Sequence, residues 1–187
     1  TSDNLIRSVC KYLGETPVLH NITVMYSPKN LMHKNMDPMN MMKKSTSTIL
    51  KGSQLWHRDA EDIKNVKIWF LCHDINETDG PTLILHPETS NRVAKKYHYK
   101  QGDKIKKDSI FLEYENDIKK IVGTGGKIFA TDTATSFHCG SRVNINSGRL
   151  VVMIHYVTSY STYYRPYLSI VNRNRKKFYV EQTKPLS

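Results

Sequence analysis

The segment Arg149–Val157 constrains the fold of this chain more than any other stretch, because it is the cleanest β-strand pattern in the sequence. Side chains of a strand alternate between two faces, so Arg149 shares its face with Val151, Met153 and His155. An arginine on an apolar strand face is unusual unless it meets an anion, since charges are rarely buried unpaired. A guanidinium can bind a carboxylate through two parallel hydrogen bonds. The segment therefore predicts a core strand that presents one cation to an anionic group.

Short apolar segments separated by turn residues recur along the rest of the chain. Strands are expected at 18–26, 45–50, 66–73, 82–87 and 127–132. A helix is expected at 3–13, ended by Gly14, with further helical fragments at 91–97 and 108–119. Many short strands with little helix predict a mainly β fold, a barrel or a sandwich with a few peripheral helices.

The length of the chain predicts one domain. Its 187 residues suffice for a single substantial core, and an apolar content of 39% lies in the globular range. Residues 90–120 are polar and rich in lysine, with too few apolar residues for a core of their own. We therefore expect a single domain over 1–187, with 90–120 as a polar insertion within it.

Neither a membrane span nor a disulfide framework is expected. No apolar run reaches the ~18 residues of a spanning helix, and no leader pattern is visible at the start. The chain begins without Met, which leaves room for an upstream segment. Its three cysteines, Cys10, Cys72 and Cys139, are widely spaced without a C-x-x-C pair. This spacing argues against disulfides or a structural zinc site and predicts a cytoplasmic location.

The basic charge narrows the function only weakly. A net charge of +11 can attract nucleic acid, anionic lipid or anionic small molecules. The lysines are scattered, which favours a solvated basic surface, and the densest cluster, 173–177, lies near the C-terminus. Residues 31–44 carry five of the seven methionines and are expected to pack on the core, with a cover over a substrate site as the alternative.

A His-x-Asp pair lies in the extended segment 54–59. His57 and Asp59 point to one face of such a segment, and Arg58 points to the other. One imidazole and one carboxylate on one face are two thirds of the facial triad that holds non-haem Fe(II) and leaves positions open. His138, between two expected strands, could supply the third ligand. A histidine such as His57 or His138, taken alone, more often has a structural role. The six other histidines are expected to be structural or exposed, and His155 has the alternative of lining the pocket.

Together these residues resemble a known family. His57-x-Asp59, distal His138 and then Arg149 resemble the iron(II)/2-oxoglutarate-dependent dioxygenases, specifically the phytanoyl-CoA dioxygenase-like branch. The stretch Asp79-Gly80-Pro81-Thr82-Leu83 resembles the Asn-Gly-Pro-Leu segment of that branch, and 136–142 resembles its distal histidine region. The resemblance runs from about residue 53 to residue 156.

The resemblance implies a double-stranded β-helix, a jelly-roll or cupin-like barrel of two antiparallel sheets. It implies His57, Asp59 and His138 as the Fe(II) ligands, Arg149 as the cation for the C5 carboxylate of 2-oxoglutarate, and O₂ as cosubstrate. Halogenating relatives lack the carboxylate, so Asp59 favours hydroxylation.

Contacts to the C1 carboxylate of the cosubstrate do not carry over from the resemblance; Gln54, Thr82, Trp69 and Ser141 are the candidates. The chain is also short for the family, and Gly140 stands where some relatives carry a serine near the cosubstrate. Arg142 is expected to be a solvated loop residue, with a second anion contact as the alternative.

The expected activity is 2-oxoglutarate decarboxylation coupled to hydroxylation of a small organic substrate, with anionic or carrier-bound compounds among the candidates. Two alternatives stay open: a nucleic-acid dealkylating dioxygenase and a non-catalytic binding module on the same fold. The first is less favoured because no second arginine follows Arg149 along its strand. The expected partner is thus a small molecule, rather than nucleic acid or a membrane, and the oligomeric state is left open.

Overall fold

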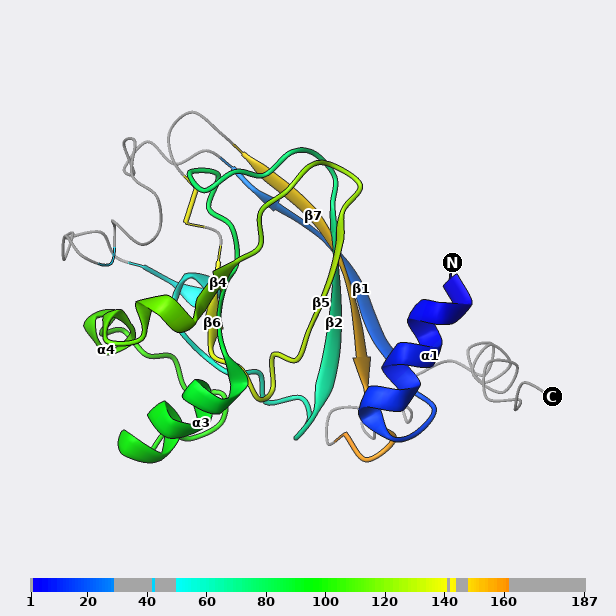
Figure 1. The fold of residues 1–187 in the computed structure, drawn as a ribbon, viewed down its shortest axis with the longest axis horizontal. Coiled ribbons are helices and arrows are strands. Elements are labelled where there is room, and N and C mark those ends of the chain that lie inside the picture. The colour runs from blue at the N-terminus through cyan, green and yellow to red at the C-terminus, as the bar shows by residue number, and fades with distance from the viewer. Residues whose placement is uncertain (1, 29–41, 43–49, 141, 144–147, 162–187) are drawn as a thin grey trace.

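Two antiparallel sheets face each other in the computed structural model, which describes residues 2–28, 42, 50–140, 142–143 and 148–161 (Figure 1). The larger sheet has the order β1 (Val18–Ser27), β7 (Arg149–Val157), β2 (Asn65–Leu71) and β5 (Ile128–Thr131). The smaller sheet has the order β4 (Ile118–Lys120), β3 (Leu83–Leu85) and β6 (His138–Cys139). All of these strand pairs are antiparallel, which confirms the mainly β prediction.

Helices cover the outside of both sheets. Helix α1 (Ser2–Leu13) lies against the larger sheet, whereas α3 (Pro87–Lys96) and α4 (Ser109–Leu112) lie on the side of the smaller one (Figure 1). Two short 3₁₀ helices, η1 (Gly52–Gln54) and η2 (Glu115–Asp117), also lie among the described residues. Gly14 has a φ of 83°, which favours glycine and ends α1 where the sequence predicts.

The two central strands, β2 and β7, show the period of two that places functional side chains inside. Val66 and Ile68 of β2 point outward and pack with Val9 and Leu13 of α1. Lys67, between them, is therefore turned toward the interior with the other alternate residues of β2. Burial alternates along β7 as well, from Arg149 to Val157. The sheet thus carries an apolar outer layer against α1 and an inner face that includes charged groups.

The polar segment 90–120 contributes to the core of the protein. Val93 and Phe111 are fully buried and belong to one cluster with Trp56 and Leu83. The helical fragment expected at 108–119 is only partly correct, because its last residues form β4 instead of helix. Pairing of β4 with the edge of β3 satisfies the backbone there, and this long-range pairing outweighs the local helical preference.

Several sequence-based expectations fall wholly or mostly on residues outside those described. They are the strand expected at 45–50, of which only Leu50 is described, most of the methionine-rich segment and the basic cluster 173–177. Met42 is described and is buried in the cluster around Trp56 and Phe111. The three cysteines are free of disulfides. Within the described ranges, no helix is both long and apolar enough to cross a membrane.

Candidate metal centre

The backbone places His57 directly opposite His138. The two residues form an antiparallel bridge, in which His57 N donates to His138 O at 3.0 Å and His138 N donates to His57 O at 2.9 Å. Two residues further along, Asp59 N donates to Thr133 O at 2.9 Å. The imidazole rings consequently lie side by side, with their centroids 4.2 Å apart. Hydrogen bonds between backbone atoms therefore position the segment 57–59, which carries two of the candidate metal ligands.

Three donor atoms converge at this point. The Nε2 atoms of His57 and His138 each lie 3.7 Å from Asp59 Oδ1. All three residues are buried, and one donor atom from each lies within 4.8 Å of the others. Donors that bind one cation at right angles, at about 2.0–2.2 Å, lie about 3 Å apart. Small side-chain adjustments would therefore bring this set to the spacing of a facial triad.

The histidines are poised as neutral ligands. Nδ1 of His57 lies 2.7 Å from Leu55 O, and Nδ1 of His138 lies 3.3 Å from Ser136 O. An Nδ1–H that donates to a carbonyl leaves the Nε2 lone pair free for a metal. Burial lowers the pKa of His57, and it lowers the pKa of His138 to about 3. Two neutral imidazoles and one carboxylate fit a divalent cation such as Fe(II).

Asp59 is ionised in this site and faces a second cation. Burial raises the pKa of its carboxyl, but the opposing influence of His138 and Lys67 brings that pKa below its usual range. The Nζ atom of Lys67 lies 2.5 Å from Asp59 Oδ2, and both side chains are buried. The sequence-based prediction did not include Lys67, although its place between Val66 and Ile68 in an apolar strand was a usable signal.

Arg149 lies in the interior at the start of β7, as the strand pattern predicts, and is 3% exposed. Its Nη1 donates to Gly80 O and to Thr82 Oγ1, both at 3.0 Å. Burial lowers its pKa to about 10, which still leaves the guanidinium charged at neutral pH. A Cβ on Gly140 would lie 3.2 Å from Thr82 Oγ1 and 3.3 Å from Arg149 Nη1. Glycine at this position therefore keeps the space beside the cation clear.

The remaining cosubstrate candidates lie in different surroundings. Thr82 contacts Arg149, as described above. Trp69 is buried, and its Nε1 donates to Thr131 Oγ1 at 2.7 Å. Gln54 accepts a hydrogen bond from Lys51 N through Oε1 at 3.0 Å. Ser141 lies outside the described residues. The structure thus brings Thr82 to Arg149, whereas these hydrogen bonds of Trp69 and Gln54 are structural ones.

The expectation that Arg142 is solvated is wrong. Its side chain is fully buried, and the guanidinium pairs with both carboxylate oxygens of Asp108 at 2.9 and 3.0 Å. Its Nε and Nη2 also donate to Gln54 O at 2.9 and 2.6 Å. The counter-ion comes from the segment 90–120, which is distant in sequence, so no local pattern marks this pair.

His155 is buried on the inner face of β7, opposite Lys67 in the strand register. Its ring makes an edge contact with His20 at a centroid distance of 4.9 Å. Burial, together with the nearby charge of Lys67, lowers the pKa of His155 to about 3. The option that His155 lines the interior is consistent with this position.

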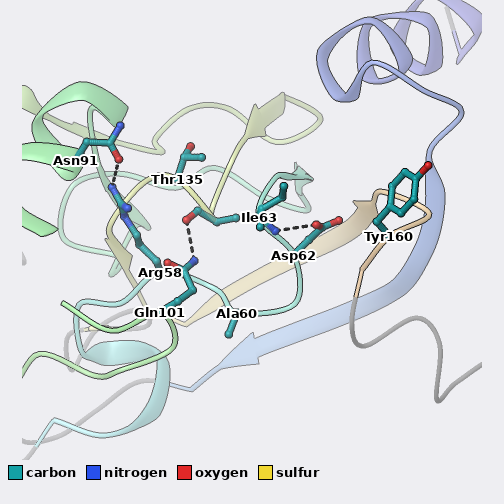
Figure 2. A pocket seen from close by; sticks show the side chains of 9 residues that line it. Arg58, Ala60, Asp62, Ile63, Asn91, Gln101, Thr135 and Tyr160 are labelled. Atoms are coloured by element: carbon teal, nitrogen blue, oxygen red, sulfur yellow. Dashed lines mark hydrogen bonds between the residues drawn. The ribbon is translucent and has the colours of Figure 1, made fainter. Parts of the chain in front are cut away.

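Arg58, which alternation predicts on the opposite face from His57 and Asp59, lines a pocket of about 530 Å³ (Figure 2). Its Nη2 donates to Asn91 Oδ1 at 2.8 Å, and its guanidinium carbon lies 5.0 Å from the centre of the Phe137 ring. None of the three candidate ligands lines this pocket. The pocket therefore lies beside the metal-ligand segment and apart from the donor atoms.

Comparison with known proteins supports the fold. No family model and no curated protein matches the sequence. Solved structures match at low identity. EctD from S. alaskensis in its apoform has a TM-score of 0.53 and 17% identity, with 81% of this chain and 48% of that chain covered. AviO1 from Streptomyces viridochromogenes Tue57 has a TM-score of 0.50 and 13% identity over 85% and 59% of the two chains. The non-heme monooxygenase ThoJ has a TM-score of 0.50 and 13% identity over 82% and 51%.

The chain thus spans about half the length of the solved structures it matches. Other structures of EctD that match contain bound Fe, or 2-oxoglutarate with 5-hydroxyectoine. At these identities the likeness concerns the fold. The two facing antiparallel sheets form a double-stranded β-helix, as the sequence resemblance implies.

Proposed function

We propose that this protein is an Fe(II)- and 2-oxoglutarate-dependent oxygenase that hydroxylates a small organic substrate. The observation that carries this proposal is the convergence of His57 Nε2, His138 Nε2 and Asp59 Oδ1 in a buried site. The similarity in fold to the non-heme monooxygenase ThoJ and to EctD, which has been solved with Fe and with 2-oxoglutarate, supports it.

The three candidate ligands would have different roles in binding iron. His57 and His138 offer Nε2 to iron while backbone carbonyls hold their Nδ1 sides, and Asp59 supplies the negative charge. With O₂, bound iron and 2-oxoglutarate supply the oxidising power for hydroxylation. Burial of all three ligands excludes bulk water from the reacting centre.

Arg149 is proposed to bind the C5 carboxylate of 2-oxoglutarate. Its guanidinium is buried in the core, and a guanidinium can bind a carboxylate through two parallel hydrogen bonds. Thr82, whose hydroxyl contacts Arg149, suits the same end of the cosubstrate. Gln54 and Trp69 stay candidates for the C1 carboxylate.

The substrate is proposed to be a small molecule, with anionic or carrier-bound compounds as the class to test first because the net charge is +11. Asp59 favours hydroxylation over halogenation. A phytanoyl-CoA dioxygenase-like affiliation, a cytoplasmic location and a single domain over 1–187 complete the proposal.

The experiment is to measure succinate formed from 2-oxoglutarate with added Fe(II) and ascorbate, with and without small carboxylic acids and acyl thioesters. Wild-type protein is expected to turn over 2-oxoglutarate slowly without substrate and faster with a fitting one. Asp59→Ala is expected to abolish both activities, whereas Asp103→Ala, which removes an exposed carboxylate, leaves them unchanged. A wild-type protein that neither binds Fe(II) nor forms succinate would overturn the proposal.

A further inference from the structure

We propose that Lys67 is a positioning residue, which engages the second carboxylate oxygen of Asp59 so that Asp59 binds the metal through Oδ1 alone. The inference rests on the proposed metal site and adds a residue that the family resemblance does not supply.

Lys67 lies at a central place in the larger sheet. It pairs in register with His155 of β7 on one side and with Thr131 of β5 on the other. Its neighbours Val66 and Ile68 face α1, so the lysine side chain enters the interior, where it is only 8% exposed. A buried lysine is rare unless it is paired, and its partner here is Asp59.

The two oxygens of Asp59 face different partners. Oδ1 lies 3.7 Å from Nε2 of each candidate histidine ligand, whereas Oδ2 lies 2.5 Å from Lys67 Nζ. The ammonium therefore engages the oxygen that is not needed for a facial triad. A metal ion that approached Oδ2 would have to displace or repel a positive charge at contact distance.

Because Oδ2 is engaged by Lys67, Asp59 can occupy only one coordination position of the metal. A carboxylate that binds through both oxygens takes two positions, and with two histidines it would leave two of six. A chelating 2-oxo acid together with O₂ needs three open positions, which the facial triad leaves only when the carboxylate uses one oxygen. Lys67 thus preserves the third open position.

The ammonium also alters the charge that the site presents. A divalent ion and one carboxylate leave a single net positive charge, and Lys67 adds a second. The added charge attracts the dianionic 2-oxoglutarate, one carboxylate of which is assigned to Arg149, so Lys67 is expected to strengthen cosubstrate binding while it slightly opposes metal binding. Stability alone is a weak reason to retain such a pair, because buried ion pairs often contribute little net stability.

The test uses Co(II), whose visible absorption reports coordination number without any turnover. Wild-type, Lys67→Met and Lys67→Arg proteins are each titrated with Co(II) and then with 2-oxoglutarate under nitrogen. The matched control is Lys120→Met, which removes a lysine from an ion pair with Glu77 (Nζ–Oε2 2.7 Å) away from the metal site.

Lys67→Met is expected to bind Co(II) no more weakly than wild type, but with a changed visible spectrum, because the second oxygen of Asp59 then takes a position that water or 2-oxoglutarate occupies in wild type. Its 2-oxoglutarate affinity is expected to fall about tenfold. Lys67→Arg should keep the wild-type spectrum, since a guanidinium can also engage Oδ2, and so should Lys120→Met. If Lys67→Met does not fold, Lys67→Gln carries the same test with a smaller shift.

Identical spectra and equal 2-oxoglutarate affinities for wild type and Lys67→Met, or for wild type and Lys67→Gln where that variant is used, would overturn the inference while leaving the metal site intact. A uniform loss of Co(II) binding and thermal stability in Lys67→Met and Lys67→Arg, with the spectrum of the bound fraction unchanged, would overturn it too and assign the lysine a purely structural role. Failure of the wild-type protein to bind Co(II) would instead overturn the proposed function, so the two failures are distinguishable.

Discussion

His57 and His138 are held opposite each other by two backbone hydrogen bonds, of 3.0 and 2.9 Å, while their rings point together into the metal centre. The bridge involves no side-chain atom. Removal of either ring therefore deletes one metal donor and leaves the scaffold that positions the other donors.

This relationship predicts a separation of binding from folding in His138→Ala. Metal affinity is expected to fall by more than about 100-fold, beyond the 10–100-fold typical for loss of an outer hydrogen-bond partner. The melting temperature without metal should change little compared with that loss. Isothermal titration with Co(II) checks the affinity, and His86→Ala, which removes an exposed imidazole, serves as the control. Equal Co(II) affinity in His138→Ala and wild type would contradict the ligand assignment.

Arg149→Gln is expected to impair 2-oxoglutarate binding without affecting the metal. Loss of a charged hydrogen-bonding partner for a carboxylate costs about 1.5–3 kcal/mol, which corresponds to roughly 10–150-fold in affinity. The glutamine can still donate to Gly80 O or Thr82 Oγ1, so these two acceptors need not both be left without a partner. Titration of the Co(II)-loaded variant with 2-oxoglutarate measures the effect, and a loss of Co(II) affinity of similar size would place Arg149 in the metal site instead.

Stability without metal is expected to decline as the pH falls from about 6.5 toward 3. His138 and His155 both have a pKa near 3 in the folded protein, against 6.5 for an ordinary histidine. Between these values the unfolded chain binds more protons, so each group lowers stability by up to about 1.4 kcal/mol per pH unit. Urea unfolding at pH 7, 6 and 5 tests this, and His155→Phe should flatten the slope. A stability that is constant over this range would show that the two rings can be protonated in the folded state.

Alanine substitutions at Gly80 and Gly14 compare how much an added methyl group lowers stability in two different surroundings. Both have positive φ, 66° and 83°, but only Gly80 is crowded, since its Cβ would lie 2.6 Å from Val143 N. Gly14→Ala is expected to cost about 1 kcal/mol from backbone conformation alone. Gly80→Ala should cost more than about 3 kcal/mol because the backbone of Val143 must also move. Chemical denaturation compares the two, and equal effects would mean that the loop at Val143 yields freely.

The pair between Arg142 and Asp108 offers a test of buried against exposed ion pairs. Asp108→Ala is expected to destabilise the fold by about 3–5 kcal/mol, since it leaves a buried guanidinium without its counter-ion. Glu113→Ala removes the partner of Lys96 in an exposed pair and should cost less than about 1 kcal/mol. Urea unfolding of both variants measures the difference.

The sequence predicted those features that depend on local periodicity. Alternation along β7 placed Arg149 in the interior, and the spacing of His57 and Asp59 placed both on one face. A period of two is a property of any extended backbone, so such predictions need no knowledge of the tertiary fold. The approach of His138 to this pair came from family resemblance, because nothing local relates two residues so far apart.

Lys67 and Arg142 show what local patterns could not predict. The role of each depends on a counter-ion, Asp59 or Asp108, whose position is set by the fold of another segment. Arg142 was expected to be solvated because loop arginines usually are. The strand at 118–120 was predicted as helix for a similar reason. It is stabilised by pairing with β3, which is distant in sequence, so the local pattern at 108–119 could not reveal that pairing.

The ion pair between Asp108 and Arg142 has a consequence for protein engineering. The lysine-rich segment 90–120 has the composition of a surface insertion that could be shortened to make a minimal catalyst. Its removal would nevertheless leave Arg142 charged and buried beside Gln54 O, and would take Phe111 out of the core. A trimmed variant is therefore expected to lose the arrangement around residues 54–59, so redesign should alter the exposed lysines and keep Asp108 and Phe111 in place.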